Sequence, residues 1–346
     1  MLITNIQFLR AFAALGVVIY HTGFLYRGSV HTELQGVAIF FVISGFIMTH
    51  ISRKGHEGFL LQRLIRIVPL YWLVTLAIFF MKLKARGAGP DLTLGALGKS
   101  LLFIPYRDST GEWLPIDGVG WTLNFEMYFY LVFAIALAAS VRFAPFIAAA
   151  AVLAIRPLAA LTSNEIFAFY AHDYIIYFTL GIAAFYLWRG IAPRLQGRGA
   201  AVTLASIASA VAFLAWHLFP ELVAACPPRI AALIDHLMPL IVVFAALCLN
   251  SIGLQSNWKP VLVLGDASYA LYLIHTQIIG QLRRMGHAID AQSGVGTVLF
   301  VMAVSCTCAV ALHYIFERPV TRRLRSLMRL PRDGKPGDAA VTRSPA

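Results

Sequence analysis

The stretch FLRAFAALGVVIYH, residues 8–21, decides the fold class of this chain. Ten residues separate Arg10 from His21, and none of them is charged. On a helix this spacing covers roughly 16 Å, which is half the thickness of a bilayer core. Ionisable side chains inside a membrane are costly to keep and are functional candidates by default. We therefore interpret this stretch as a membrane helix that carries two candidate functional residues.

Composition extends this interpretation to the whole chain. Of the 346 residues, 59% are hydrophobic and 13% are charged, whereas about a quarter of the residues of a soluble domain are charged. The formal net charge is +12, but the basic residues lie in loops and in the tail and are not interleaved with stacking aromatic residues. We expect them to orient the protein and to contact membrane lipids, and we expect no nucleic-acid partner.

The pattern of apolar runs predicts an all-α, polytopic membrane protein with about ten transmembrane helices. The first run is predicted to be retained, because Arg10 interrupts it and no small-residue cleavage pattern follows. A short run near 95–105 is predicted to be an interfacial or re-entrant helix. The predicted spans are 7–26, 34–52, 65–82, 120–140, 143–162, 172–189, 200–219, 230–250, 261–282 and 295–316.

The distribution of basic residues predicts the orientation. With ten spans, the side that holds both termini carries 17 of the 28 Lys and Arg residues, and the other side carries ten. The positive-inside rule therefore places both termini in the cytoplasm. We expect a transmembrane domain over 4–320 and a basic, disordered tail over 321–346, whose last part is rich in Pro and Gly.

This topology predicts that three titratable side chains from three separate helices lie at similar depth: His21, Glu126 and His275. A carboxylate beside an imidazole fixes its tautomer and stabilises its cation, which is how general bases are built. Each residue also has a structural interpretation, because a histidine in a span is often a hydrogen-bonded packing residue. Asp266, at the start of the same motif region as His275, is explained as the cap of the helix that follows it.

A second cluster lies at the predicted cytoplasmic side. Arg63 and Arg66 are three residues apart, so they share a helix face. Arg10 is expected at the same level. Three arginines there could bind the phosphates of a cytoplasmic acyl-coenzyme A, or they could serve the positive-inside rule alone.

Several chemistries have no support in the sequence. The four cysteines form no CxxC pair and are read as small core residues. No Walker loop, GxGxxG turn, GxSxG elbow or HExxH helix is present. We expect no metal.

Motifs along nearly the whole chain, about 4–320, resemble those of the membrane acyltransferase-3 family, in particular its exopolysaccharide O-acetyltransferase branch. No single motif is specific, but all of them occur in order. They are R-x10-H at Arg10 and His21, FFVISGF at 40–46, RxxR at Arg63 and Arg66, W-x-L-x-x-E-x-x-F at Trp121 to Phe129, S-Y-x-L-Y-L-x-H at Ser268 to His275, and ERP at 317–319.

The resemblance implies a multi-pass protein of the bacterial inner membrane that moves an acyl group, usually acetyl, from cytoplasmic acetyl-CoA to a sugar hydroxyl. The acceptor would be a glycan or lipid-linked oligosaccharide, with polysaccharide biosynthesis machinery as a further partner. The resemblance also implies that His21 is the catalytic histidine and that Arg63 and Arg66, supported by Arg10, bind the coenzyme.

Acetyl transfer to an alcohol needs a base for the hydroxyl and a donor for the oxyanion. We assign His21 as the base and Glu126 as its orienting carboxylate. Tyr272 or Ser44 is a candidate oxyanion donor. Trp121, Ser268 and His275 are candidate supporting residues.

Other functions stay open at this stage. A proton-coupled transporter or flippase of a glycan or small metabolite would use the same buried His and Glu as a proton relay. An acyl-lipid acceptor or sensor without turnover is a weaker alternative. The sequence does not distinguish a covalent acyl-histidine from direct transfer.

Overall fold

The computed structural model describes residues 3–23, 26–27, 30–31, 34–53, 58–87, 89–290 and 293–330. Within these ranges the chain is helical apart from its loops and two short strands, β1 (Tyr26–Arg27) and β2 (Val30–His31), which pair antiparallel. The helices of the first half are α1 (Thr4–Thr22), α2 (Gly36–Ser52), α3 (Phe59–Arg86), α4 (Leu94–Leu101), η1 (Gly118–Gly120), α5 (Trp121–Ala139), α6 (Ala144–Ala160) and α7 (Glu165–Tyr170). Those of the second half are α8 (Tyr174–Ile191), η2 (Ala192–Leu195), α9 (Gly199–Leu218), α10 (Pro220–Ala224), α11 (Pro228–Ser251), α12 (Lys259–Asp266), α13 (Ser268–Arg284), α14 (Val295–Leu312), η3 (His313–Glu317) and α15 (Arg318–Leu327).

Each predicted span overlaps helical structure, although the one predicted over 7–26 is helical only as far as Thr22, where α1 ends. Among the described residues, six helices are long and apolar enough to cross a membrane, or up to seven if the bent pair α12–α13 is one span. Helices α2 and α6 are apolar but shorter, at 17 residues each. The protein is therefore a multi-pass membrane protein, while ten crossings and cytoplasmic termini stay predictions. The predicted short helix near 95–105 is present as α4.

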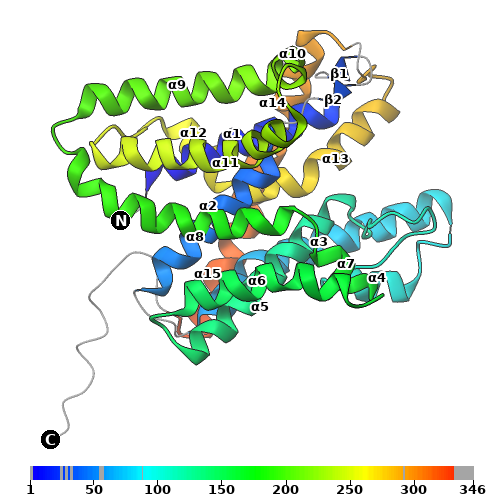
Figure 1. Ribbon diagram of the computed structural model, residues 1–346. Helices are drawn as coiled ribbons and strands as arrows, with labels where there is room; N and C mark the ends of the chain where they lie inside the picture. The colour runs from blue at the N-terminus through cyan, green and yellow to red at the C-terminus, as the bar shows by residue number, and fades with distance from the viewer. Residues whose placement is uncertain are drawn as a thin grey trace, which may run out of the picture.

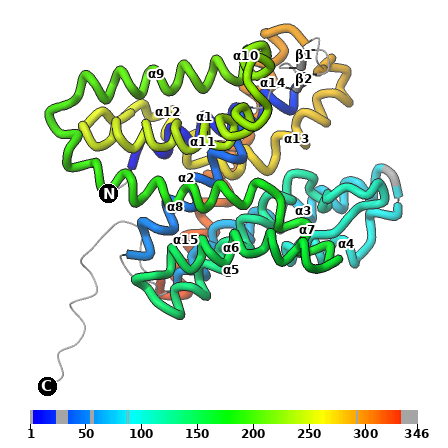
Figure 2. The backbone as a smooth tube through the Cα atoms, viewed as in Figure 1, coloured from blue at the N-terminus to red at the C-terminus, as the bar shows by residue number. Residues whose placement is uncertain are grey.

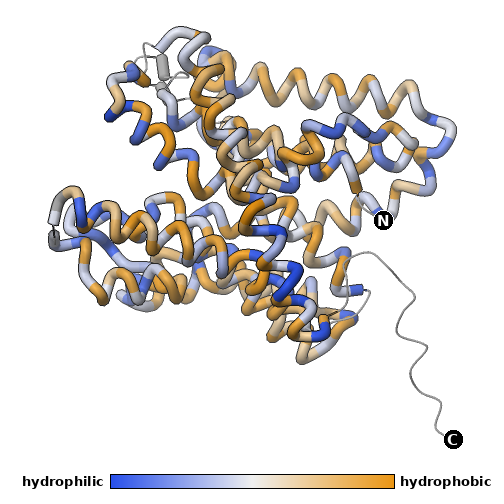
Figure 3. The backbone as a smooth tube through the Cα atoms, turned by 180° about the vertical axis from the view of Figure 1, so that it is seen from behind, coloured by the Kyte–Doolittle hydropathy of each residue, from blue (hydrophilic) through white to orange (hydrophobic). Residues whose placement is uncertain are grey.

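The helices form two groups, with α2 and α8 between them (Figure 1). One group contains α1, α9, α11, α12, α13 and α14, and the other contains α3, α5, α6, α7 and α15. Figure 2 shows that the start of α1 and the turn from α8 to α9 lie at one end, which we call the N-terminal end. The β1–β2 hairpin, α4, α7 and α10 lie at the other, which we call the hairpin end. Hydrophobic residues follow most of the helices, and hydrophilic residues gather in the connecting segments (Figure 3).

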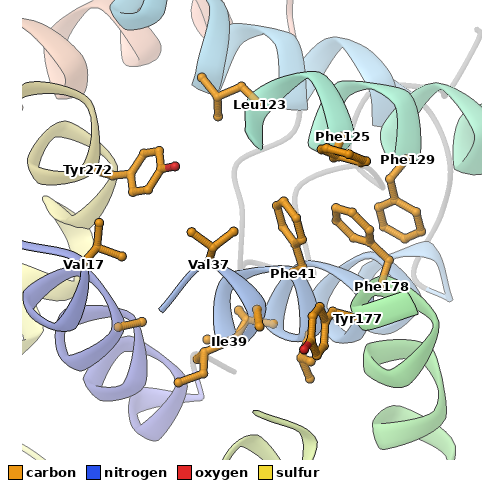
Figure 4. Close-up of a cluster of buried hydrophobic side chains, with 14 of the residues drawn as sticks. Val17, Val37, Ile39, Phe41, Leu123, Phe125, Phe129, Tyr177, Phe178 and Tyr272 are labelled. Carbon is orange, nitrogen blue, oxygen red and sulfur yellow. The ribbon is translucent and has the colours of Figure 1, made fainter. Parts of the chain in front are cut away.

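Two glycines bring α2 and α8 into backbone contact. A Cβ on Gly45 would overlap the backbone oxygen of Phe178, and a Cβ on Gly181 would overlap that of Val42. Small residues permit such close helix approach in membranes. The Phe41 ring stacks on Phe178 beside the crossing, with ring centroids 4.4 Å apart (Figure 4). The FFVISGF motif thus has a structural role at this crossing.

The span predicted over 261–282 is not one continuous helix. Helices α12 and α13 meet at Ala267 and are bent by 75°. A Cβ on Gly265, in the last turn of α12, would overlap the backbone oxygen of Gln7 on α1. This close approach holds α12 against α1, and beyond the bend α13 packs against α1 as well. Asp266 is exposed, and no side-chain cap hydrogen bond starts α13.

The C-terminal helical structure continues past the predicted boundary at residue 320. Helix α14 passes through the π-helical segment η3 into α15, which ends at Leu327. In η3 the Nδ1 atom of His313 lies 2.8 Å from the Glu317 carboxylate, which belongs to the ERP motif. Part of the predicted tail, 321–327, is therefore helical, and its last part, 331–346, lies outside the described residues.

Candidate active site

One cavity between the helices contains the predicted arginines, and we call it the arginine cavity. It encloses about 720 Å³ of space not filled by atoms, its open mouth included. Its polar lining consists of Arg10, Ser44, Arg63, Arg66, Thr122, Glu126, Tyr130, Ser268, Tyr269 and Tyr272. Three arginines against one glutamate leave two positive charges in excess, so this cavity suits an anion.

Helices α1 and α3 supply the three arginines. Arg10 lies in the second turn of α1, is 7% exposed and donates to the Gln7 side chain at 2.9 Å. Arg63 and Arg66 lie in the first two turns of α3, and Arg63 is 4% exposed. Buried guanidinium groups need anionic or hydrogen-bonding partners. Their convergence on one cavity agrees with the common level that the sequence predicts.

The second cavity contains His21 and lies toward the hairpin end of α1; we call it the histidine cavity. Its polar and aromatic lining consists of Tyr20, His21, Lys82, Trp121, Tyr174, Tyr272, Thr276 and Gln277. Trp121 and Tyr174 meet edge to face, with ring centroids 5.2 Å apart. The buried hydroxyl of Thr276 has no hydrogen-bond partner among the described residues. Aromatic rings beside hydroxyl and amide groups suit a polar, ring-shaped ligand.

His21 and His275 form a contacting pair. The Nε2 atom of His275 lies 3.2 Å from the Nδ1 atom of His21, and the ring centroids are 4.8 Å apart. His275 is fully buried, and its Nδ1 lies 2.6 Å from the backbone oxygen of Tyr272. The contact agrees with the common depth that the sequence predicts for these two residues.

The hydrogen bonds of the pair determine the tautomers of the neutral rings. A carbonyl oxygen accepts only, so Nδ1 of His275 carries the proton and its Nε2 is an acceptor. Nδ1 of His21 lies 2.9 Å from the backbone oxygen of Val17 and therefore also carries a proton, which faces His275 Nε2 as well. The basic nitrogen of neutral His21 is consequently Nε2.

Glu126 does not orient His21, which corrects that part of the prediction. In the described part of the chain no hydrogen bond joins the two residues. The Glu126 carboxylate instead accepts from the Ser44 hydroxyl at 2.9 Å and from the Tyr130 hydroxyl. The rotation of α5 turns Glu126 into the arginine cavity, and the residue that touches His21 is His275.

Tyr272 links the two cavities, since it lines both. Its hydroxyl lies 2.7 Å from the Thr122 hydroxyl and donates to the backbone oxygen of Val119 at 3.2 Å. The predicted oxyanion donors therefore both have partners: Tyr272 through Thr122 and Val119, and Ser44 through Glu126. Either hydroxyl would have to leave these partners to serve an oxyanion.

The predicted supporting residues divide between the cavities. Trp121 lines the histidine cavity. Ser268 lines the arginine cavity, and its fully buried hydroxyl has no hydrogen-bond partner among the described residues. Thr122 and Tyr130 were not predicted as site residues, although both line the arginine cavity. Their four-residue spacing from Glu126 places all three on one face of α5, and that spacing was a usable signal.

Asp117 lies beside the histidine cavity, just before η1, and is fully buried. Burial raises the pKa of its carboxyl to about 7, an effect that the Val119 backbone amide and the nearby Lys82 only partly oppose. The Lys82 ammonium donates to the Ile116 backbone oxygen at 2.9 Å. Across the described residues, no three His, Cys, Asp or Glu side chains gather to form a possible metal site.

Comparisons with known proteins identify the family of this chain. The family described as an acyltransferase domain matches residues 3–314. The exopolysaccharide production protein ExoZ of Rhizobium meliloti (strain 1021) is 33% identical over 306 residues, which cover 84% of this chain and 90% of ExoZ. The putative peptidoglycan O-acetyltransferase YrhL of Bacillus subtilis (strain 168) is 24% identical over 94% of this chain and 56% of YrhL. No solved structure matches the chain.

Proposed function

Because the chain belongs to the acyltransferase domain family, we propose that it transfers an acetyl group from cytoplasmic acetyl-CoA to a sugar hydroxyl of an exopolysaccharide or related envelope glycan. The similarity to ExoZ supports the glycan class, and the similarity to YrhL supports O-acetylation. The acceptor is a free or lipid-linked glycan, and the bacterial cytoplasmic membrane is the site of action.

One observation carries this proposal: α1 presents Arg10 to the arginine cavity and His21 to the histidine cavity. A single helix therefore joins an anion-binding cavity to a cavity that contains a base. Arg63 and Arg66 add two further cations to the first cavity. Coenzyme A carries several phosphates, and arginine matches phosphate through paired donors. The arginine cavity is thus the proposed donor site.

The histidine cavity is the proposed acceptor site. A sugar hydroxyl held against His21 gives its proton to Nε2, and its oxygen attacks the thioester carbonyl carbon. The tetrahedral oxyanion collapses, the carbon–sulfur bond breaks, and the coenzyme thiolate takes the proton back from His21. Acetyl-CoA and an alcohol thus give an acetyl ester and the free thiol. His275 holds the His21 ring in the reactive tautomer and is a positioning residue.

Glu126 belongs to the donor side in this proposal. Its carboxylate fixes Ser44 and Tyr130 beside the arginines. It also balances part of their charge, so that the cavity does not hold three unopposed cations. The sequence assigned Glu126 to catalysis, and its assignment here is to the organisation of the donor site.

A cellular experiment tests the function directly. Deleting the gene should abolish O-acetyl signals in the NMR spectrum of the host exopolysaccharide, and the wild-type gene should restore them. Purified protein in vesicles should consume acetyl-CoA only when alkali-treated exopolysaccharide, freed of its esters, is present. Movement of glycan across vesicles without any requirement for acetyl-CoA would instead establish the transporter or flippase alternative.

A further inference from the structure

Two side chains form the wall between the arginine cavity and the histidine cavity. Val37, at the start of α2, and Tyr272, on α13, each line both cavities. Each is 8% exposed. In Figure 4 the Tyr272 ring projects from α13 into the space between Val37 and Leu123. The separation between the cavities at this point is therefore one side chain thick.

Contacts from three sides hold this wall in place. The Tyr272 hydroxyl is bonded to Thr122 and to the backbone oxygen of Val119. Its backbone oxygen accepts from His275, the residue that touches His21. The start of α2 is fixed as well, because a Cβ on Gly36 would meet the backbone oxygen of Ala13 at 2.5 Å. Closely packed side chains of this kind leave little room for an extra atom.

We propose that Val37 and Tyr272 are the acyl-size filter of the enzyme, admitting acetyl and rejecting longer acyl groups. The inference rests on the proposed function. The coenzyme is held on one side of the wall and the base lies on the other, so the acyl carbonyl must sit at the wall during transfer. Everything beyond the acyl methyl group must then fit among Val37, Tyr272 and Thr122. The filter adds no chemical step to the transfer.

The expected size of the effect follows from general experience with apolar pockets. One additional methylene group changes discrimination by roughly 10–200-fold. Val37→Ala and Tyr272→Leu each remove atoms from the wall, so each should improve transfer from propionyl-CoA and butyryl-CoA relative to acetyl-CoA. Val37→Ile adds one methylene group and should lower even acetyl transfer. Tyr272→Phe keeps the ring and should keep the wild-type preference.

The test measures kcat/KM for acetyl-, propionyl- and butyryl-CoA with the purified full-length chain in nanodiscs and alkali-treated host exopolysaccharide as acceptor. Val42→Ala is the matched control, because Val42 is fully buried on the same helix and lines neither cavity. We expect Val37→Ala to reduce the preference for acetyl over butyryl by at least about tenfold, and Val42→Ala to leave that ratio unchanged.

The possible outcomes distinguish failure of the proposed filter from failure of the proposed function. Acetyl transfer with an unchanged ratio in Val37→Ala and Tyr272→Leu would overturn the filter and leave the acetyltransferase standing. Equal relaxation by Val42→Ala would also overturn it, because general loosening would then explain the change. No transfer from any acyl-CoA by the wild type would overturn the proposed function, and the filter with it. Val37→Ile gives a reading that does not depend on folding of the smaller variants.

Discussion

Replacing Arg63 and Arg66 together by lysine separates a coenzyme site from topological charge. Both side chains line the arginine cavity, and Arg63 is 4% exposed. Lysine keeps the positive charge that membrane orientation requires, but it lacks the planar fork that grips two phosphate oxygens. The double variant should therefore insert normally and bind acetyl-CoA poorly.

The magnitude follows from one charged hydrogen bond lost at each position. Such a bond contributes roughly 1.5–3 kcal/mol, so two together weaken binding by about 3–6 kcal/mol. At about 1.4 kcal/mol for each factor of ten, this is a loss of roughly 10²–10⁴ in affinity. Because neighbouring arginines act jointly, each single variant should lose at least about tenfold.

Calorimetric titration of acetyl-CoA into nanodisc-embedded protein measures the effect. Arg142→Lys with Arg189→Lys is the matched control, because both of these arginines are exposed and neither lines the cavity. Wild-type affinity in the Arg63 and Arg66 double variant would exclude both residues from coenzyme binding and leave them a role in membrane orientation alone.

Four further changes have defined outcomes. Glu126→Gln removes one negative charge from the arginine cavity, so acetyl-CoA should bind at least as tightly in calorimetry while turnover falls; weaker binding would contradict its donor-side role. His275→Asn, which cannot reach His21, should lower kcat more than His275→Gln does, by roughly 1–3 kcal/mol in activation free energy, and equal rates would exclude positioning. Gly45→Ala should lower the thermal midpoint in detergent, because its methyl group meets backbone, whereas Gly190→Ala meets nothing within 4 Å and should not. The Asp117 carboxyl has a folded-state pKa raised from 3.8 to about 7, so the free energy of unfolding should fall as pH rises from about 4 to 7, by up to about 4 kcal/mol. This fall should be absent from thermal melts of Asp117→Asn across that range, and a fall equal to that of the wild type would contradict the prediction.

Helical spacing predicted how far apart the residues of one helix lie along its axis. Arg10 and His21 lie eleven residues apart on α1, and they face different cavities as that distance implies. Arg63 and Arg66, near the start of α3, line the same cavity as Arg10 near the start of α1. Depth follows from the rise per residue, so apolar runs and loop charges suffice to estimate it.

Rotation and bending were not predictable in the same way. Glu126 faces Ser44 and Tyr130 because of how α5 is rotated against α2, and the depth of a residue does not determine that rotation. The bend between α12 and α13 depends on Gly265 meeting the backbone of Gln7, a residue far away in sequence. The contact of His275 with His21 follows from the same tertiary arrangement.

The C-terminal tail shows that helical structure extends further than was predicted from the sequence. The sequence RPVTRRLRSL, residues 318–327, is basic, and the predicted boundary at 320 lies just past the ERP motif, where the family resemblance ends. It nevertheless continues η3 as helix α15, which packs against α3. Composition indicates where a chain meets water, whereas packing against a neighbouring helix decides where helical structure ends.

His21 is proposed as the base for acetyl transfer, and a comparison of two histidine variants tests this role. Purified His21→Ala and His217→Ala proteins are assayed with radiolabelled acetyl-CoA and alkali-treated host exopolysaccharide. His217 is a matched control, because its Nδ1 lies 2.7 Å from the backbone oxygen of Phe213, four residues earlier, as His21 relates to Val17, and it lines neither cavity. General-base catalysis contributes roughly 10²–10⁴-fold. We expect a loss of that size in His21→Ala with acetyl-CoA affinity retained, and near wild-type transfer in His217→Ala. Transfer by His21→Ala within about tenfold of wild type would contradict the claim.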